Sequence, residues 1–306
     1  MFSKKYKIVT SLILVLGIVF IFAVIGYEKN YSNSSKVEAK GFQWEVKKDN
    51  KTMYLIGTMH PINNDYEYFN KTIKEILRNT DVLAVEINPS EDELLKINVE
   101  GTYSGGKSIE DELNKKQIKN LKSICKEVNC DYEKIRVLKP YLVVNNLQSI
   151  LYERAGLAME TFDDMLIKNS LKKNKRVVEL ETIGFQVNLL NKVNGIDALK
   201  VNLDLHKDGK FIENGKDIIN YSKELMNGYS KGDSKVMEEA IKFQKQNKKE
   251  YNLMIKDRNI NMVKKMEGFF NENGVYAIAV GSLHFFGEDG IVNIMKNKGY
   301  EVTRIE

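Results

Sequence analysis

The stretch that decides the fold is residues 275–287, Val-Tyr-Ala-Ile-Ala-Val-Gly-Ser-Leu-His-Phe-Phe-Gly. Its first six residues are apolar or aromatic, which predicts a strand buried on both faces. Gly281 ends this run, and His284 follows three residues later. Ligands of open α/β sheets bind at the carboxyl ends of the strands. The stretch therefore predicts an α/β fold with His284 at a functional edge of its sheet.

The same pattern occurs near the other end of the chain, where residues 53–60 read Met-Tyr-Leu-Ile-Gly-Thr-Met-His. Two of the three histidines thus stand in a Gly-x-x-His motif directly after a strand-like run. A lone histidine is more often structural, but the matched settings of His60 and His284 favour a functional role. Gly57 and Gly281 are expected to be required by the turns that present these histidines.

The segments around the two motifs resemble an internal repeat. Residues 52–87 and 275–305 each read strand, Gly-x-x-His, helix, strand, so each predicts a β-α-β unit with parallel strands. We predict an α/β fold with a mostly parallel mixed sheet, edged by an N-terminal hairpin, flanked by many helices, and carrying both histidines at one rim. The other expected elements are a hairpin over 42–56, a strand over 176–180, and helices in much of 91–172, 183–200 and 214–272.

The N-terminus predicts a membrane segment. Three lysines precede an uncharged stretch over 8–27, which has about the length needed to span a bilayer. We predict a signal anchor over 1–27 with its N-terminus in the cytoplasm, because the lysines stay inside. A cleaved signal peptide and secretion are the alternative. Residues 28–40 predict a polar linker, and 41–306 predict one extracytoplasmic domain.

The charge pattern argues against nucleic acid as a partner. The net charge is +5, but Lys, Asp and Glu are interleaved and form no basic stripe. The only cysteines are Cys125 and Cys130, which would face different sides of one continuous helix. A disulfide between them requires the helix to end near Asn129, so the sequence leaves both the paired and the unpaired state open.

Two glutamates occur within or at the end of predicted strands. Glu86 stands in Val-Leu-Ala-Val-Glu-Ile, and Glu181 ends Val-Val-Glu-Leu-Glu, on the same strand face as Glu179. A carboxylate is costly to bury alone, so each either faces water beyond the sheet or acts at its edge. Beside His60 and His284, these oxygens would complete a site for Mn²⁺, Co²⁺ or Zn²⁺, or one would be a general base.

Arg258 and Asn259 stand in a predicted helix over 253–270. Arg258 shares a helical face with Met254, and Asn259 lies on a neighbouring apolar stripe. A guanidinium on an inward face needs partners. Those partners are either structural carboxylates, namely the two glutamates above, or a substrate carbonyl.

These residues together resemble the TraB/GumN family over residues 41–306. The resemblance implies a relation to pheromone-shutdown proteins and to Tiki-like metalloproteases, whose paired Gly-x-x-His motifs are associated with a divalent metal. A more distant relation to erythromycin-esterase-like hydrolases is also implied. The residues that carry the resemblance are Tyr54 to His60, Val85-Glu86-Ile87, Leu180-Glu181-Thr182 with Gln186, Arg258-Asn259, Val280 to His284, and Gly287-Glu288-Asp289-Gly290.

The sequence thus predicts a membrane-anchored, metal-dependent hydrolase that acts on peptides. His60 and His284 would hold the metal with Glu86 or Glu181, and the spare glutamate would take a proton from the bound water. Arg258 and Asn259 would orient the substrate or stabilise a developing oxyanion. Two alternatives remain open: a protein that binds or sequesters peptides without turnover, and a metal-free hydrolase in which a histidine is the general base.

Overall fold

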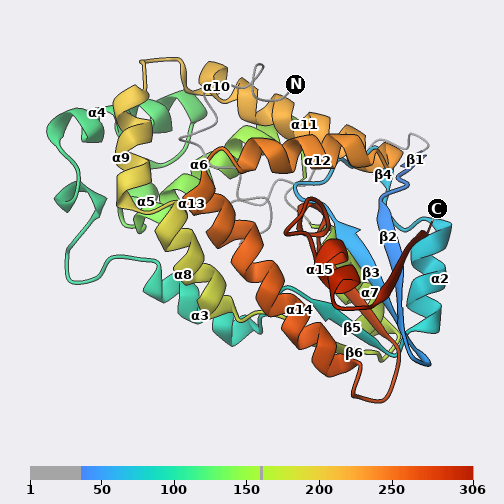
Figure 1. The fold of residues 1–306 in the computed structure, drawn as a ribbon. Coiled ribbons are helices and arrows are strands. Elements are labelled where there is room, and N and C mark those ends of the chain that lie inside the picture. Colours follow the sequence, from blue (N-terminus) through green and yellow to red (C-terminus); the bar gives the residue numbers. More distant parts are fainter. Residues whose placement is uncertain (1–35, 159–160, 306) are drawn as a thin grey trace.

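The computed structural model describes residues 36–158 and 161–305, which form a mixed α/β fold around a six-stranded sheet (Figure 1). The strand order is β6-β5-β7-β3-β2-β8. The buried run at the second Gly-x-x-His motif becomes β7, in the middle of this order. The strands of the sheet are β2 (Phe42–Lys48), β3 (Lys51–Thr58), β5 (Val82–Val85), β6 (Arg176–Glu179), β7 (Tyr276–Gly281) and β8 (Glu301–Ile305).

The sheet is mostly parallel, as predicted. Neighbouring strands from β6 to β3 are parallel, whereas β2 runs antiparallel to both β3 and β8. The predicted position of the N-terminal hairpin at the sheet edge is wrong, because β8 pairs with the free side of β2. The strands of each β-α-β unit run in the same direction but are not neighbours, since β7 lies between β3 and β5, and β3 and β2 lie between β7 and β8.

The helices pack around two hydrophobic cores. One core surrounds the sheet, and the other is formed mainly by α4, α6 and α9 together with the short helices beside them. Figure 1 shows this second, helical part at the end of the molecule opposite the sheet. The α-helices are α2 (Lys71–Asn79), α3 (Glu91–Glu100), α4 (Lys115–Val128), α5 (Tyr132–Arg136), α6 (Pro140–Arg154), α7 (Phe162–Lys172), α8 (Ile183–Val193), α9 (Ile196–Leu205), α10 (Phe211–Asn214), α11 (Lys216–Lys231), α12 (Ser234–Gln244), α13 (Lys248–Tyr251), α14 (Asp257–Phe269) and α15 (Ile291–Asn297).

The predicted helical region over 214–272 is divided into several pieces. Helix α11 is capped by Gly232, whose φ of +65° suits glycine, and α12 follows directly. A short π-helix, Asn252–Lys256, lies between α13 and α14. It lies directly before α14, whose second residue is Arg258, and such π segments are frequent at functional sites.

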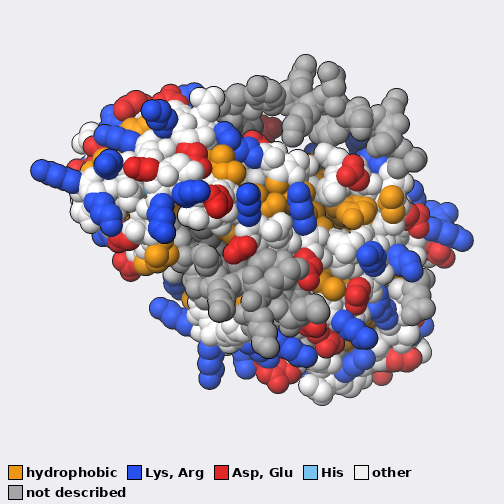
Figure 2. Space-filling view, turned by 90° about the horizontal axis from the view of Figure 1, so that it is seen from above, with side chains coloured by type: hydrophobic (Ala, Val, Ile, Leu, Met, Phe, Trp, Pro, Cys, Tyr) orange, Lys and Arg blue, Asp and Glu red, His pale blue; other side chains and the backbone are white. Residues whose placement is uncertain are grey.

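The predicted membrane segment over 1–27 lies outside the described residues. Among the residues that the structure describes, no helix has the length and apolar character needed to cross a membrane. The end of the predicted linker packs on the domain: β1 (Val37–Glu38) pairs with β4 (Tyr66–Glu67), and Asn70 Nδ2 donates to the carbonyl of Ala39 at 2.8 Å. Charges of both signs are interspersed on the face seen in Figure 2, beside a band of hydrophobic side chains.

The two motif glycines differ in what they require. Gly281 has φ −50° and ψ 132°, a conformation open to any residue, and an added Cβ would lie 3.5 Å from Glu86 Oε1. The predicted backbone requirement at Gly281 is therefore wrong. Gly57 lies within β3 and needs space instead: an added Cβ would lie 2.7 Å from Ser282 Oγ and 3.3 Å from Phe42 Cβ.

We expect Gly57→Ala to lower the free energy of unfolding by about 1–3 kcal/mol, because the added methyl group overpacks a buried contact. Gly184→Ala is the matched control. Among the described residues nothing lies within 4 Å of its added Cβ, so helix propensity should make it neutral or slightly stabilising. Urea unfolding of the two variants measures the difference. Equal stabilities would contradict the steric role of Gly57.

Candidate functional site

The predicted site residues follow strands that end at the same edge of the sheet. Because β3, β7, β5 and β6 are parallel, their carboxyl ends lie together: Thr58 is paired with Gly281, and Val85 with both Ala279 and Glu179. His60, Glu86, Glu181 and His284 follow these ends, and all four are buried. The main chain links the two glutamates directly, since the N–H of Glu181 donates to the carbonyl of Glu86 at 2.9 Å.

Arg258 is the centre of the contacts at this edge. Its side chain is fully buried, as its helical face predicts. Nε donates to Glu181 Oε1 at 2.9 Å, and Nη2 donates to Glu181 Oε2 at 2.8 Å and to Glu86 Oε2. Burial opposes its charge, but the two carboxylates outweigh this effect and raise the pKa of Arg258. The sequence left carboxylates and a substrate carbonyl open as partners of Arg258, and in the structure it pairs with both glutamates.

The remaining hydrogen bonds of the glutamates come from Gln186 and from the strand β7. Gln186 Nε2 donates to Glu86 Oε2 at 3.2 Å and to Glu181 Oε2 at 3.0 Å. The N–H of Gly281 donates to Glu86 Oε1 at 2.9 Å. All four carboxylate oxygens therefore accept a hydrogen bond from within the protein, which is what buried carboxylates require.

The network assigns the tautomer of His284. Asn259 Nδ2 donates to the carbonyls of His284 and Asp289, at 3.0 and 2.7 Å. The amide oxygen of Asn259 must then face His284 Nδ1, 2.6 Å away, so Nδ1 carries the hydrogen. The other ring nitrogen, Nε2, lies 3.1 Å from Arg258 Nη1 and accepts from it. Burial, reinforced by the Arg258 charge, holds the pKa of His284 well below its ordinary value.

We expect His284 to remain neutral from pH 8 to well below pH 6.5. Because its pKa is lowered in the folded state, the neutral ring contributes stability above the unfolded pKa of about 6.5, and this contribution is lost as the pH falls toward the folded pKa. Imidazole NMR signals of the folded protein measure the titration, with the urea-unfolded chain as the control. A folded-state midpoint near that of the unfolded chain would contradict this electrostatic description.

His60 lies across the pocket with a different partner, Asp163 of α7. Its Nδ1 is 3.4 Å from Asp163 Oδ2, and Asp163 Oδ1 accepts from Thr58 Oγ1 at 3.1 Å. Burial is the main cause that raises the pKa of Asp163 to about 6. Among the described residues, both ring nitrogens of His60 and Asp163 Oδ2 are buried without a hydrogen-bond partner. Such atoms are uncommon and indicate a place for a ligand, a water or an ion.

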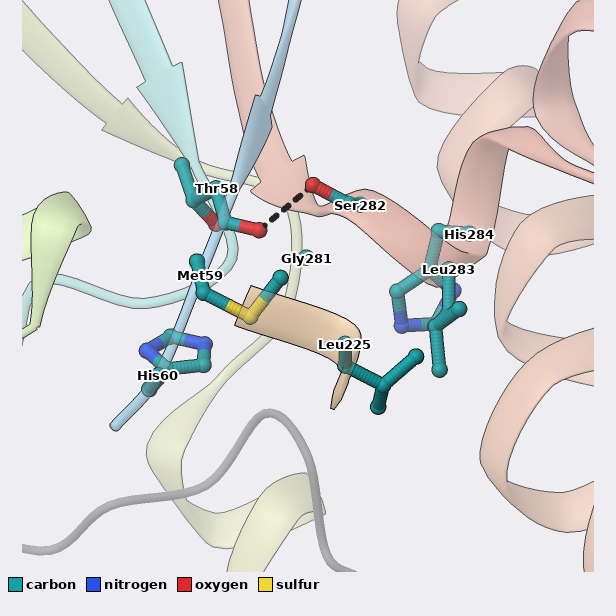
Figure 3. A pocket seen from close by; sticks show the side chains of 8 residues that line it. All are labelled: Thr58, Met59, His60, Leu225, Gly281, Ser282, Leu283 and His284. Carbon is teal, nitrogen blue, oxygen red and sulfur yellow. Dashed lines mark hydrogen bonds between the residues drawn. The ribbon is translucent and has the colours of Figure 1, made fainter. Parts of the chain in front are cut away.

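A small pocket joins the two Gly-x-x-His motifs. It is lined by residues 58–60, Leu225 and residues 281–284, so both histidines contribute to its wall. About 20 Å³ is open to the centres of water molecules, which is room for about one. Figure 3 shows the two imidazoles on opposite sides of this pocket, with Met59 and Leu225 drawn between them and Ser282 Oγ hydrogen-bonded to the carbonyl of Thr58.

The predicted metal ligands fall into two groups in this structure. Over 36–158 and 161–305, no three His, Cys, Asp or Glu side chains are grouped to hold a metal. Glu86 and Glu181 are occupied by Arg258 and Gln186, and His284 by Arg258 and Asn259. His60 and Asp163, by contrast, fit a divalent ion in part, because their unpartnered atoms are an imidazole nitrogen and a carboxylate oxygen, both suitable ligands.

The sequence interpretation did not identify Asp163, and it gave Gln186 no role. Thr161 and Asp164 form a capping box that begins α7, so a helix start could be expected there. Nothing local distinguishes Asp163 from an ordinary acidic residue in a first helical turn. Only the packing of α7 on β5 and β6 brings it to the strand edge.

The chain is similar to a known protein family and to proteins of two bacteria. The sequence profile of the TraB/PrgY/gumN family matches residues 42–304. The uncharacterized protein YbaP of Escherichia coli (strain K12) is 21% identical over 251 residues, which are 81% of this chain and 89% of YbaP. YbaP of Shigella flexneri is similar to the same extent. No solved structure matches the chain. From the span of the profile, which includes both Gly-x-x-His motifs, the chain belongs to the TraB/PrgY/gumN family.

Proposed function

We propose that this protein is a metal-dependent hydrolase in which His60 and Asp163 contribute the metal ligands. One observation carries the proposal: three buried polar atoms of these two residues have no hydrogen-bond partner within the described chain, and His60 lines a pocket. Each unsatisfied polar group costs about 1–3 kcal/mol, so a ligand that satisfies them is favoured. The resemblance to Tiki-like metalloproteases suggests peptides as the substrate class.

The bound metal would lower the pKa of a water and polarise the scissile carbonyl. The chain's own residues have separate tasks in this proposal. Arg258 holds Glu86 and Glu181 beside β7 and donates to His284 Nε2, so the pocket wall opposite His60 is rigid. Asn259 fixes the His284 ring, whose neutral form adds no positive charge next to the guanidinium. Glu86 and Glu181 thereby orient Arg258 and do not bind the metal.

The metal-free alternative rests on the pairing of His60 with Asp163. A carboxylate 3.4 Å from Nδ1 can orient the ring and leave Nε2 to accept a proton from water, as in other His–carboxylate pairs. The same residues would then perform general base catalysis. A protein that only binds peptides uses the same pocket without turnover, and the experiment below distinguishes these three cases.

Purified full-length protein should contain or take up one class of divalent ion and hydrolyse peptides from a mixed library. We expect a chelator to abolish turnover and Mn²⁺, Co²⁺ or Zn²⁺ to restore it. We also expect Asp163→Asn to weaken metal binding by about 10- to 100-fold, because an amide is a poorer ligand than a carboxylate. Metal analysis and mass spectrometry of the library measure both effects.

The matched control is Asp164→Asn, which changes the neighbouring carboxylate at the helix cap but not the one beside His60. Equal metal affinity in the two variants would refute Asp163 as a ligand. Turnover that survives removal of all metal would support the metal-free alternative. Peptide retention without cleavage would support the binding protein.

We also propose that residues 1–27 anchor the protein in the membrane with the domain outside the cytoplasm. The support is the uncharged stretch after three lysines. N-terminal sequencing of membrane-extracted protein tests this proposal, because a mature start between residues 27 and 40 would identify a cleaved signal peptide.

A further inference from the structure

Helix α4 ends in a cap that reverses the chain sharply. Asn129 has φ 55° and ψ 45°, the left-handed conformation that terminates many helices. The N–H of Cys130 then donates to the carbonyl of Cys125 at 2.9 Å, five residues back, and the N–H of Asn129 donates to Lys126 at 3.3 Å. These two bonds define a Schellman motif.

The motif brings the two cysteines of the chain together. In such a motif the side chains of the residues at its two ends are frequently in contact. Cys125 and Cys130 occupy these ends, and their thiols hydrogen-bond to each other. On an uninterrupted helix, residues at this spacing would face different sides, so the cap at Asn129 is what makes the contact. Both are free thiols in the structure, with Cys125 buried and Cys130 partly exposed.

We propose that Cys125 and Cys130 are a redox pair that closes into an intrachain disulfide at the end of α4 while the cap keeps its backbone conformation. Disulfides require α-carbons within about 7 Å and side chains directed toward each other, and the cap supplies this arrangement. The pair belongs to the hydrophobic core of the helical part. This part lies at the end of the molecule opposite the sheet (Figure 1), whereas most of the pocket is lined by residues at the ends of β3 and β7. The proposal is therefore independent of the proposed hydrolase activity.

The thiols have different roles in closure. The hydrogen bond from Cys125 lowers the pKa of Cys130, whereas that hydrogen bond and burial raise the pKa of Cys125. The Cys130 thiolate attacks an external disulfide and forms a mixed disulfide while one external thiolate leaves. Cys125 then loses its proton and attacks the Cys130 sulfur, which releases the second external thiol. Two protein thiols are oxidised and one external disulfide is reduced to two thiols.

The test uses full-length protein equilibrated with oxidised and reduced glutathione, followed by alkylation and intact-mass measurement. Oxidised protein should be lighter by two hydrogens and incorporate no alkylating reagent. Dithiothreitol should restore incorporation at both cysteines. Cys125→Ser and Cys130→Ser should each give a persistent glutathione adduct or an interchain dimer instead.

Two variants of the cap test the geometric cause. Asn129→Gly keeps the left-handed conformation available, so closure should be unchanged or easier. Asn129→Val disfavours it by about 1–2 kcal/mol, so the equilibrium constant for closure should fall by about 5- to 30-fold. If both thiols remain alkylated at every glutathione ratio, or if the glutathione adduct persists in the wild type, the proposal is refuted. Equal closure in the Gly and Val variants would refute the role of the cap.

Discussion

Arg258→Met is expected to lower the free energy of unfolding by about 3–5 kcal/mol, the usual cost of removing one partner of a buried ion pair. The reason is that, within the part of the chain that the structure describes, Glu86 and Glu181 would keep only Gln186 and the Gly281 N–H as donors in a buried site. Urea or thermal unfolding measures this change. His284 would also lose the donor to its Nε2.

Arg258→Lys separates the charge from the geometry. Lysine keeps a positive charge but cannot donate in a planar fork to Glu181 while also reaching Glu86. We expect a smaller loss of stability than with methionine and a strong loss of activity. The control is Arg136→Met, since Arg136 pairs with Glu133 at the surface and such pairs contribute only about 0–1 kcal/mol. Similar losses in Arg136→Met and Arg258→Met would contradict the central role of Arg258.

His60→Ala is expected to abolish activity at little cost in stability. A general base typically contributes about 10²–10⁴-fold, and loss of a metal ligand has at least a comparable effect. Because neither ring nitrogen of His60 has a hydrogen-bond partner among the described residues, its removal breaks no such bond. Hydrolysis rates and urea unfolding, measured on the same preparation, give both quantities.

The comparison with His284→Ala makes the His60 prediction specific. His284 bonds to Asn259 and Arg258, so its removal should cost more stability than the removal of His60. Equal destabilisation by the two substitutions, or an active His60→Ala variant, would show that His60 is a structural residue and would remove the basis of the proposed function.

The sequence by itself determined the strands and the edge where the site lies. Apolar runs ending in Gly-x-x-His predicted β3 and β7, and the parallel direction of these strands predicted that His60 and His284 follow the same edge. The inward face of the helix containing Arg258 could also be predicted from the sequence, because apolar residues recur there at helical spacing. These features depend on patterns among residues that are close together in the sequence, so the sequence alone is enough to predict them.

Only the tertiary structure decided which side chains are partners. The sequence could not show that Arg258 occupies both glutamates, or that Asp163, from a helix about a hundred residues away, meets His60. Nor could it place β8 outside the hairpin, because strand order depends on long-range packing. A local pattern predicts which residues face inward but not which side chains they contact. A buried charge needs a partner that compensates for its burial, and that partner comes from an element distant in the chain.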